Sequence, residues 1–310
     1  MPRVKKSTFQ IGWAVSIVLS VAVLLYTFIT MYIPYIQFLA DNPLSVEGKS
    51  IGNIVKDPIF YFFDIVDLTF IGLILLFFLP GYLYRKDFRW RNAADNSLPD
   101  FLREIGDAQK VGLPLPRAVV EASKREYGPL TEELRFMASK MSWGVGFHES
   151  LLRMKKRINT RLFDRTSVLI LEAERSGGSI EDVFEAAHNH VSELLAVKRE
   201  RAAAMQSYTW IIYAAYVVFA FVMVILLISF FATMATQSML FAGSEVESTI
   251  NIVNIAALEL LFFHMLMIQG SFSGIVAGKM GSGDAYLGLT HNIVLLTIGY
   301  LIYKIMVIII

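Results

Sequence analysis

Five apolar stretches, each long enough to cross a lipid bilayer, constrain this chain more than any other feature of its sequence. Two lie before a charged block that runs roughly from Arg85 to Ser207, and three lie after it. A helix satisfies its own backbone hydrogen bonds and can therefore span lipid. We expect a multi-pass membrane protein whose spans are Ile11–Ile33, Phe60–Tyr84, Tyr208–Met234, Ile252–Ala277 and Ile293–Ile310.

The composition agrees with a membrane protein and excludes several other classes. Hydrophobic residues make up 55% of the chain and charged residues 18%, which is more apolar than a soluble domain. The net charge of +1 provides no whole-molecule field for nucleic acid. The chain has no cysteine, which excludes disulfides, thiolate metal sites and a cysteine nucleophile.

The distribution of Lys and Arg predicts the orientation in the membrane. Basic residues precede the first span, follow the second and precede the third, whereas the segment Ala235–Thr249 has none. Because cytoplasmic loops carry the excess of Lys and Arg, we expect the N-terminus and the charged block in the cytoplasm and the C-terminus outside the cell membrane. Trp90 and Trp210 are expected at the membrane interface.

The charged block has the periodicity of helices. Apolar residues recur at helical spacing in three stripes, and Gly- and Pro-containing segments separate them. Ser97 with Asp100, and Ser179 with Asp182, resemble capping boxes at helix starts. The segments predict six helices, the fourth near Phe147–Arg157 and the fifth near Thr160–Arg175.

The expected fold is therefore all-α, with a six-helix cytoplasmic bundle inserted between the second and third of about five transmembrane helices. Three domains follow from this arrangement. They are an N-terminal membrane hairpin (1–84), the cytoplasmic bundle (85–207) and a C-terminal membrane region with three spans (208–310).

The last helix of the block is predicted to continue into the membrane. From Ser179 to Ala242 there is no glycine and no proline, so no residue in this range breaks a helix. At about 1.5 Å per residue, a helix that ends near Met234 would be roughly 80 Å long. Such a helix is a candidate for mechanical coupling between the block and the membrane.

No motif in the sequence predicts an enzyme. The glycine-containing segments WGVGFHES and GKMGSGDAY lack the spacing of a phosphate-binding loop, so ATP hydrolysis is not expected. His188 and His190 point to different sides of a helix and do not form a metal site. We expect no catalytic residue, no cofactor and no metal.

Ionisable residues in the predicted spans are functional candidates, because charge is costly in lipid. They are Asp64, Asp67, Glu259 and Lys304. One interpretation is an ion path or a contact with a translocating partner. The other is pairing between helices, for example of Glu259 with Lys304, together with an interfacial position for the two aspartates.

Two further patterns predict contacts. Gly270, Gly274 and Gly278 form a ridge at four-residue spacing that lets another helix approach closely, either within the chain or in a second subunit. A basic run marks the junction of the fourth and fifth bundle helices. It fits a solvated face, a surface for anionic lipid or a docking site for an acidic partner, and consists of Arg153, Lys155, Lys156, Arg157 and Arg161.

The sequence LPDFLREIGDAQKVGLPLPRAVVEASKREYGPLTEELRFMASKMSWGV (98–145), followed by SGGSIEDVF (176–184), resembles the cytoplasmic domain of the type II secretion F family. Its YGPL, TEEL and WG segments, and the later segment GIVAGKMGSGDAYLGLTHN (274–292), are similar to the archaeal FlaJ-like branch, which is related to TadC. The resemblance covers roughly Leu98 to Ile310.

The resemblance implies a non-enzymatic membrane platform of a type IV pilus-like machine, an archaeal pilus or archaellum. Such platforms engage a hexameric cytoplasmic secretion ATPase and act on pilin or archaellin subunits, so the basic run is expected to contact the ATPase. Archaellar members are often near twice this length, with two cytoplasmic domains. The chain is accordingly expected to be a short member, to pair with a second homologous platform chain or to form a homodimer. The alternative function is an ion-coupled transporter or channel that uses Asp64, Asp67 and Glu259.

Overall fold

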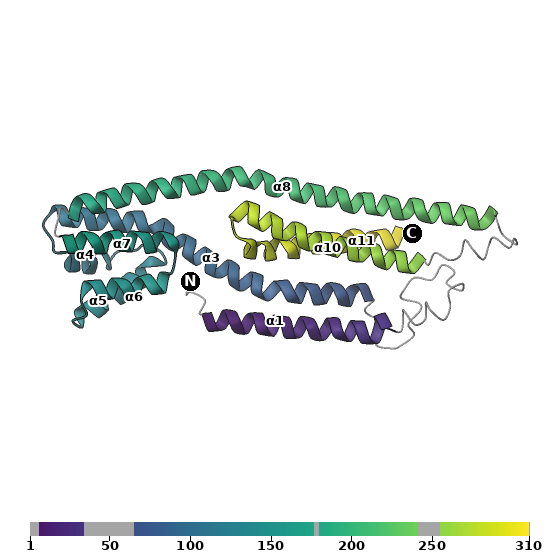
Figure 1. Ribbon diagram of the computed structural model, residues 1–310, viewed down its shortest axis with the longest axis horizontal. Helices are drawn as coiled ribbons and strands as arrows, with labels where there is room; N and C mark the ends of the chain where they lie inside the picture. The colour runs from purple at the N-terminus through teal and green to yellow at the C-terminus, as the bar shows by residue number, and fades with distance from the viewer. Residues whose placement is uncertain (1–5, 34–64, 177–179, 241–254, 310) are drawn as a thin grey trace. The chain divides into compact units, whose positions relative to one another are not determined.

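The computed structural model describes residues 6–33, 65–176, 180–240 and 255–309, and every regular element in these ranges is helical. The all-α fold class is thus confirmed for the described residues. Figure 1 shows the elements, which are α1 (Lys6–Thr27), the π-helical turn η1 (Phe28–Tyr32), α3 (Ile65–Lys110), α4 (Leu115–Ala122), α5 (Leu130–Ser142), α6 (Phe147–Ile158), α7 (Arg161–Ser176), α8 (Ile180–Leu240), α10 (Ile255–Ser282), the 3₁₀ turn η4 (Ala285–Leu287) and α11 (Gly288–Ile309).

Five helical segments within the described ranges are long and apolar enough to cross a membrane. The prediction of five apolar spans is therefore confirmed by helix length and composition. The segments are Ser7–Thr30, Ile65–Lys110, Glu181–Phe230, Leu260–Ser282 and Ala285–Met306. The first part of the predicted span Phe60–Tyr84, and Asp64 with it, lies outside the described residues.

The chain forms two compact units. The charged unit comprises Arg85–Ala203, and the membrane unit comprises the described parts of residues 5–84 and 204–310. Two helices, α3 and α8, continue from one unit into the other without an interruption in their helical backbone. The prediction that the last helix of the block runs on into an apolar span is thus realised in α8, which has 61 residues.

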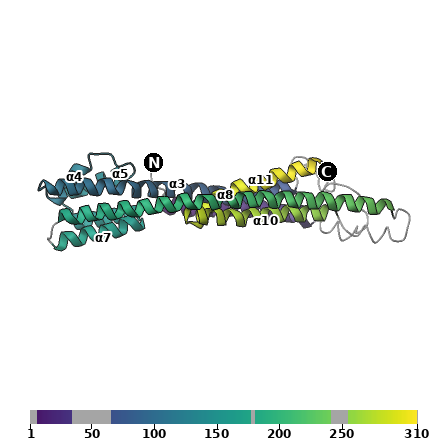
Figure 2. The same cartoon turned by 90° about the horizontal axis from the view of Figure 1, so that it is seen from above.

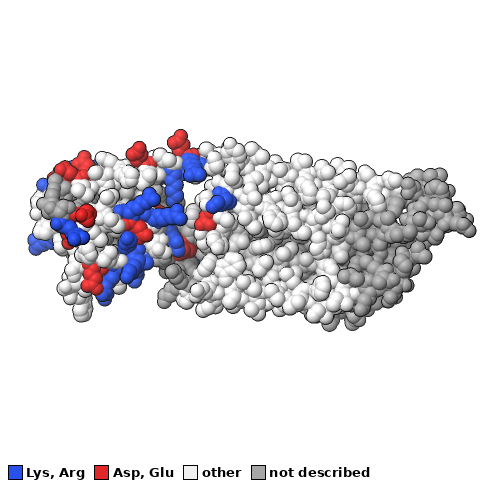
Figure 3. Space-filling model, viewed as in Figure 1, with Lys and Arg blue, Asp and Glu red and all other residues white. Residues whose placement is uncertain are grey.

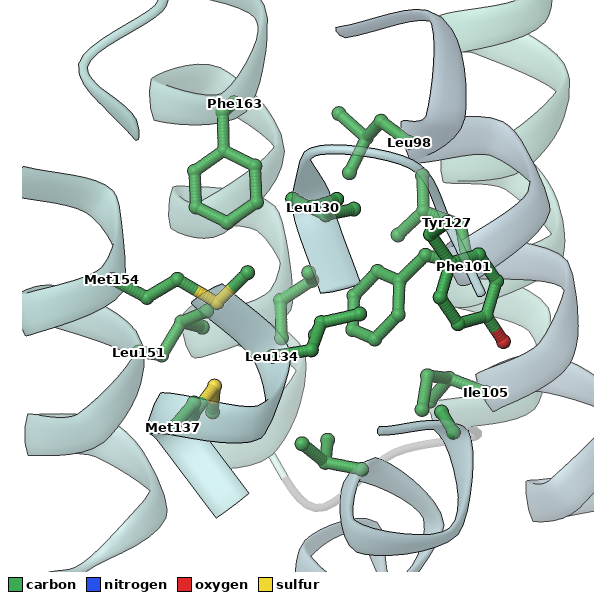
Figure 4. Packing of buried hydrophobic residues seen from close by; sticks show 14 of the residues in the cluster. Leu98, Phe101, Ile105, Tyr127, Leu130, Leu134, Met137, Leu151, Met154 and Phe163 are labelled. Carbon is green, nitrogen blue, oxygen red and sulfur yellow. The ribbon is translucent and has the colours of Figure 1, made fainter. Parts of the chain in front are cut away.

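The charged unit is held together by one apolar cluster to which each of its helices contributes. On α3 the residues at helical spacing, Leu98, Phe101 and Ile105, are nearly inaccessible to solvent. They pack with the buried faces of α5 and α6, as Figure 4 shows for Leu134 and Met154. Removing such side chains from water is the main stabilising term for a helical unit of this kind.

Two expectations about α3 are wrong. Ser97 does not cap a new helix, because its hydroxyl donates to the carbonyl of Ala93 at 3.1 Å, one turn back in a continuing helix. The first bundle helix is consequently the second half of α3. Trp90 is also not an interfacial residue: only 4% of its surface is exposed, and it belongs to the core of the charged unit. Trp210, by contrast, is 67% exposed.

In the membrane unit, small and hydroxyl-bearing residues bring α1 and α3 together. The Ser16 hydroxyl donates to the carbonyl of Leu76 at 3.0 Å, and the Ser20 hydroxyl donates to the carbonyl of Gly72 at 2.8 Å. Both serines are buried. Hydrogen bonds of this kind contribute to helix association in lipid, where the hydrophobic effect between helices is absent.

Helices α10 and α11 form a tightly packed pair, which Figures 1 and 2 show side by side. A Cβ atom on Gly274 would lie 2.6 Å from the backbone nitrogen of Asn292, and one on Gly278 would lie 2.9 Å from the carbonyl carbon of Leu287. These positions therefore exclude any side chain. The backbones approach closely because both residues are glycine.

Helix α8 joins this pair through Tyr216, whose ring is 1% exposed. The Tyr216 hydroxyl lies between Gly270 of α10 and Gly299 of α11, and a Cβ atom on Gly270 would be 3.1 Å from it. The same hydroxyl donates to the carbonyl of Leu266 at 3.3 Å. Gly270 and Gly299 thus leave the space that the Tyr216 hydroxyl occupies in the membrane unit.

This arrangement predicts a suppressor relationship between Gly299 and Tyr216. The Gly299→Ala methyl group would meet the Tyr216 hydroxyl, and overpacking of this kind costs about 1–3 kcal/mol of unfolding free energy. Tyr216→Phe removes the obstructing oxygen. We expect the double variant to unfold at a higher temperature than Gly299→Ala alone, measured by circular dichroism on the detergent-purified protein.

Gly106→Ala is the matched control, because its methyl group would lie 3.5 Å from Phe184 Cβ, an ordinary contact. Its α3 site should tolerate alanine or gain up to about 1 kcal/mol from helix propensity. Strictly additive effects of Gly299→Ala and Tyr216→Phe would show that the two residues are not coupled.

Candidate docking surface

The basic run lies on α6 and at the start of α7, and the apolar spacing of α6 determines which of its residues face outward. Phe147, Leu151, Met154 and Ile158 recur every three or four residues and are buried in the core of the charged unit. The charged residues between them must therefore lie on the opposite side of an amphipathic helix. Arg153, Lys156 and Arg157 are exposed, and Lys155 is half-buried.

The turn between α6 and α7 is fixed by a buried polar contact. Asn159 ends α6 in the left-handed conformation, with φ of 49°. Thr160 follows, and its hydroxyl accepts a hydrogen bond from the backbone N–H of Phe163 at 3.2 Å and donates to Asp95 Oδ1 of α3 at 2.5 Å. Burial raises the pKa of Asp95 above its ordinary value, and the hydrogen bond from Thr160 opposes that shift. Asp95 thus anchors the turn that carries the basic run.

Two arginines of the run have partners within the charged unit. Arg153 Nη2 lies 2.5 Å from Glu149 Oε1, one turn away on α6. Arg157 makes a two-pronged contact with Glu133 of α5, with distances of 2.5 Å and 3.1 Å, and its guanidinium carbon lies 4.3 Å from the centre of the Phe136 ring. The Glu133 side chain is only 8% exposed. Arg157 therefore neutralises a buried carboxylate and joins α6 to α5.

The remaining cations carry no such partner. Among the described residues, Lys155, Lys156 and Arg161 form no ion pair, and neither does Arg165, which is exposed one turn after Arg161 on α7. Figure 3 shows Lys and Arg side chains gathered over α6 and α7. We call Lys155, Lys156, Arg161 and Arg165 the docking patch. Because its charges are not neutralised internally, it can attract an acidic surface.

The predicted intramembrane charges include one close pair. Lys304 Nζ of α11 lies 2.8 Å from Asp67 Oδ1 of α3, and the Tyr300 hydroxyl donates to the same oxygen at 2.6 Å. Tyr300 also stacks on Phe70, with 4.2 Å between ring centres. Asp67 and Lys304 thus join α3 to α11. Asp64 lies outside the described residues, as does the side chain of Glu259, so pairing of Glu259 with Lys304 stays a prediction.

A second polar contact in the membrane unit involves His264 of α10. Its Nδ1 donates to the carbonyl of Leu260 at 2.6 Å, which leaves Nε2 to accept a hydrogen bond from the Tyr32 hydroxyl at 2.6 Å. The contact joins the π-helical turn after α1 to α10. The three glycines of the predicted ridge, Gly270, Gly274 and Gly278, all face neighbours within the chain, namely Tyr216, Asn292 and the start of α11.

Within the described ranges, no group of three or more His, Asp or Glu side chains is placed to hold a metal ion. Sequence reasoning missed several contributors to the sites above, among them Arg165, the Glu133 partner of Arg157 and the Tyr300 partner of Asp67. Arg165 could have been found from its spacing to Arg161. Glu133 and Tyr300 are distant in sequence from their partners, so no local pattern indicates them.

Comparison with known proteins identifies the class to which this arrangement is similar. The sequence profile of the family described as Type II secretion system (T2SS), protein F, matches residues 101–228. The match supports the resemblance to the type II secretion F family over this part of the chain. It includes most of the charged unit and the part of α8 that enters the membrane unit.

The uncharacterized protein MJ1286 of Methanocaldococcus jannaschii is 26% identical over 252 residues, which are 81% of this chain and 40% of the relative. The chain thus spans about two fifths of the length of that relative. No solved structure matches the chain. The more specific resemblance to FlaJ and TadC stays a prediction.

The Asp95 anchor predicts a pH dependence of stability. Folding raises the pKa of the Asp95 carboxyl group, so the folded chain binds this proton more tightly than the unfolded chain does. The bound proton therefore contributes to the free energy of unfolding below the ordinary pKa of 3.8. That contribution is lost as the pH rises towards the raised pKa. Asp95→Asn keeps an oxygen for the Thr160 hydroxyl and removes the charge. The unfolding midpoint of this variant, relative to the wild type, should therefore rise as the pH increases from 4 to 7.

Asp164→Asn is the control, because Asp164 is half-buried on α7 and forms no ion pair in the described structure. A constant difference between Asp95→Asn and the wild type across this pH range would contradict the assignment of the buried charge.

Proposed function

We propose that the chain is the membrane platform of a type IV pilus-like machine, an archaeal pilus or archaellum, and that it couples a hexameric cytoplasmic secretion ATPase to the assembly of filament subunits. The partners are that ATPase, pilin or archaellin subunits and either a second copy or a second homologous platform chain. The platform itself performs no catalysis. The N-terminus and the charged unit lie in the cytoplasm, and the C-terminus lies outside the cell membrane.

The docking patch is the observation that carries this proposal. Lys155, Lys156, Arg161 and Arg165 are cations without an ion pair in the described structure, on the unit where the type II secretion F match begins. A patch of one sign favours association with a partner of the opposite sign and increases the rate of encounter. An acidic surface on the ATPase is the partner that the family resemblance suggests.

Continuity of α8 supports the coupling part of the proposal. The helix begins in the charged unit at Ile180 and ends at Leu240 after an apolar segment. An unbroken helix resists bending more than a loop does, so a force applied by a partner at the charged unit can reach the membrane-spanning segment. Its contact with the α10–α11 pair through Tyr216 extends this route within the membrane unit.

The alternative function, an ion-coupled transporter or channel, draws less support. Asp67 is the described acid on which that function would depend, and it is paired with Lys304 and receives a hydrogen bond from Tyr300. Pairing between helices accounts for both charges without an ion path.

Charge reversal of the docking patch tests the proposed function. We expect Lys156→Glu/Arg161→Glu/Arg165→Glu to abolish capture of the purified ATPase in a pulldown, at least about tenfold below the wild type, and to abolish filament assembly in cells. Arg157 is left unchanged because its replacement would leave the buried carboxylate of Glu133 without its partner and destabilise the fold.

The control is Arg103→Glu/Lys124→Glu, which reverses charge at two exposed sites on α3 and after α4. It should bind the ATPase as the wild type does. Normal ATPase capture and normal filaments in a correctly folded docking-patch variant would remove these residues from the interface.

The stiffness of α8 makes a separate prediction. Replacing Ala202, Ala203 and Ala204 by glycine preserves the helical register but costs about 1 kcal/mol of helix propensity at each position. We expect this variant to capture the ATPase normally and to assemble at most about a tenth of the wild-type filaments, counted by electron microscopy. The corresponding triple serine variant, which weakens the helix less, should assemble more filaments than the glycine variant. Wild-type assembly by the glycine variant would show that helix continuity is not required.

A further inference from the structure

A second group of cations lies on α3 and α8, separate from the docking patch. Arg85, Lys86 and Arg89 directly follow the apolar span of α3, and their spacing places them on one side of the helix. Arg85 and Arg89 are exposed and Lys86 is half-buried. None of the three forms an ion pair within the described part of the chain.

Helix α8 adds three more cations, and two of them contact α3 at positions about one and two turns beyond Arg89. Lys198 Nζ donates to Asn92 Oδ1 at 2.8 Å, and Arg199 donates to Asn96 Oδ1 at 3.3 Å, so this part of α8 lies beside α3. Arg201 follows on α8 and is exposed. Because the partners of Lys198 and Arg199 are neutral amides, these hydrogen bonds orient the two side chains without cancelling their charge.

Acidic residues nearby do not neutralise this group. Asp87 Oδ2 lies 2.6 Å from Arg91, and the buried Asp95 accepts a hydrogen bond from Thr160, with a smaller charge interaction with Lys198. Glu200 is the exposed acid on the same stretch of α8. The group therefore keeps an excess of positive charge next to a segment that enters the bilayer.

We propose that these six cations form a binding surface for the phosphate headgroups of anionic phospholipids. Guanidinium groups bind phosphate oxygens through two parallel hydrogen bonds, and basic residues beside a membrane span are attracted to anionic lipid. The exposed Tyr82, which precedes Lys86 by one turn in the continuous helix α3, is a residue type enriched at the headgroup level. We call this group the lipid belt; it comprises Arg85, Lys86, Arg89, Lys198, Arg199 and Arg201.

The position of the lipid belt favours lipid over a soluble acidic partner. Lipid phosphates are present wherever the helix leaves the bilayer, and the belt begins at the residue after Tyr84, where the membrane unit ends along α3. The docking patch, in contrast, lies on α6 and α7, which contain no membrane-spanning segment. This proposal does not depend on the proposed function.

The test is a lipid titration of the full-length protein purified in a zwitterionic detergent. Fluorescent phosphatidylglycerol and phosphatidylcholine are added separately, and the mole fraction of lipid at half-saturation is measured by energy transfer from the tryptophans. We expect the wild type to prefer phosphatidylglycerol by at least about tenfold and 0.5 M NaCl to reduce that preference.

Two neutralised variants locate the site: Arg85→Gln/Lys86→Gln/Arg89→Gln and Lys198→Gln/Arg199→Gln/Arg201→Gln. Each should lose most of the preference, at least about fivefold, without a change in phosphatidylcholine binding. The matched control, Lys155→Gln/Lys156→Gln/Arg161→Gln, removes three cations from the docking patch and should keep the preference. The charge-retaining variant Arg85→Lys/Arg89→Lys should keep most of the preference for phosphatidylglycerol.

Several results would overturn the proposal. An absence of preference in the wild type refutes it whether or not the variants fold. An unchanged preference in both belt variants, or an equal loss in the docking-patch control, shows that the belt is not the site. If soluble glycerol phosphate displaces the lipid at equal concentration, the belt binds free anions rather than a lipid surface.

Discussion

A lipid bilayer offers no hydrogen-bond partner to a backbone amide, and every regular element described in the membrane unit is helical in accordance with that constraint. The same constraint changes how helices associate. Since lipid tails are as apolar as leucine side chains, association depends on close backbone approach and on hydrogen bonds between helices. Gly274 and Gly278 provide the first between α10 and α11, and Ser16 and Ser20 provide the second between α1 and α3.

The charged unit is stabilised differently, by burial of apolar stripes in one core. Its surface charges fall into three kinds with different consequences. Arg157 stabilises the fold, because it neutralises the buried carboxylate of Glu133. The cations of the docking patch on α6 and α7 form no ion pair among the described residues, and two cations of the lipid belt donate to neutral amides, which leave their charge intact. The number of basic residues does not distinguish these three kinds of charge. The groups that each basic side chain contacts do distinguish them.

Much of the fold could be predicted from local patterns. The bounds of α6 and α7 lie within a residue or two of the predicted ranges, since their apolar spacing and flanking breakers are both local signals. The Ser97–Asp100 pattern was misleading because a serine hydroxyl in a helix interior can bond the carbonyl one turn back, and spacing alone does not distinguish the two uses. Trp90 was misplaced for a related reason: an aromatic residue near a span fits an interface and a core equally well.

The sequence by itself determined the five apolar spans, the all-helical class and the uninterrupted course of α8, because these depend on composition and on the absence of helix-breaking residues along one segment. Only the tertiary structure decided which charges are paired, since the partners Glu133 and Arg157, and Asp67 and Lys304, lie far apart in the chain. It also decided why Gly270 and Gly299 are needed, because the atom that fills the space they leave is the hydroxyl of Tyr216, which comes from a third helix. The spacing of apolar residues along one segment specifies a helix and its buried face. The packing of helices that are distant in sequence specifies which residues contact that face.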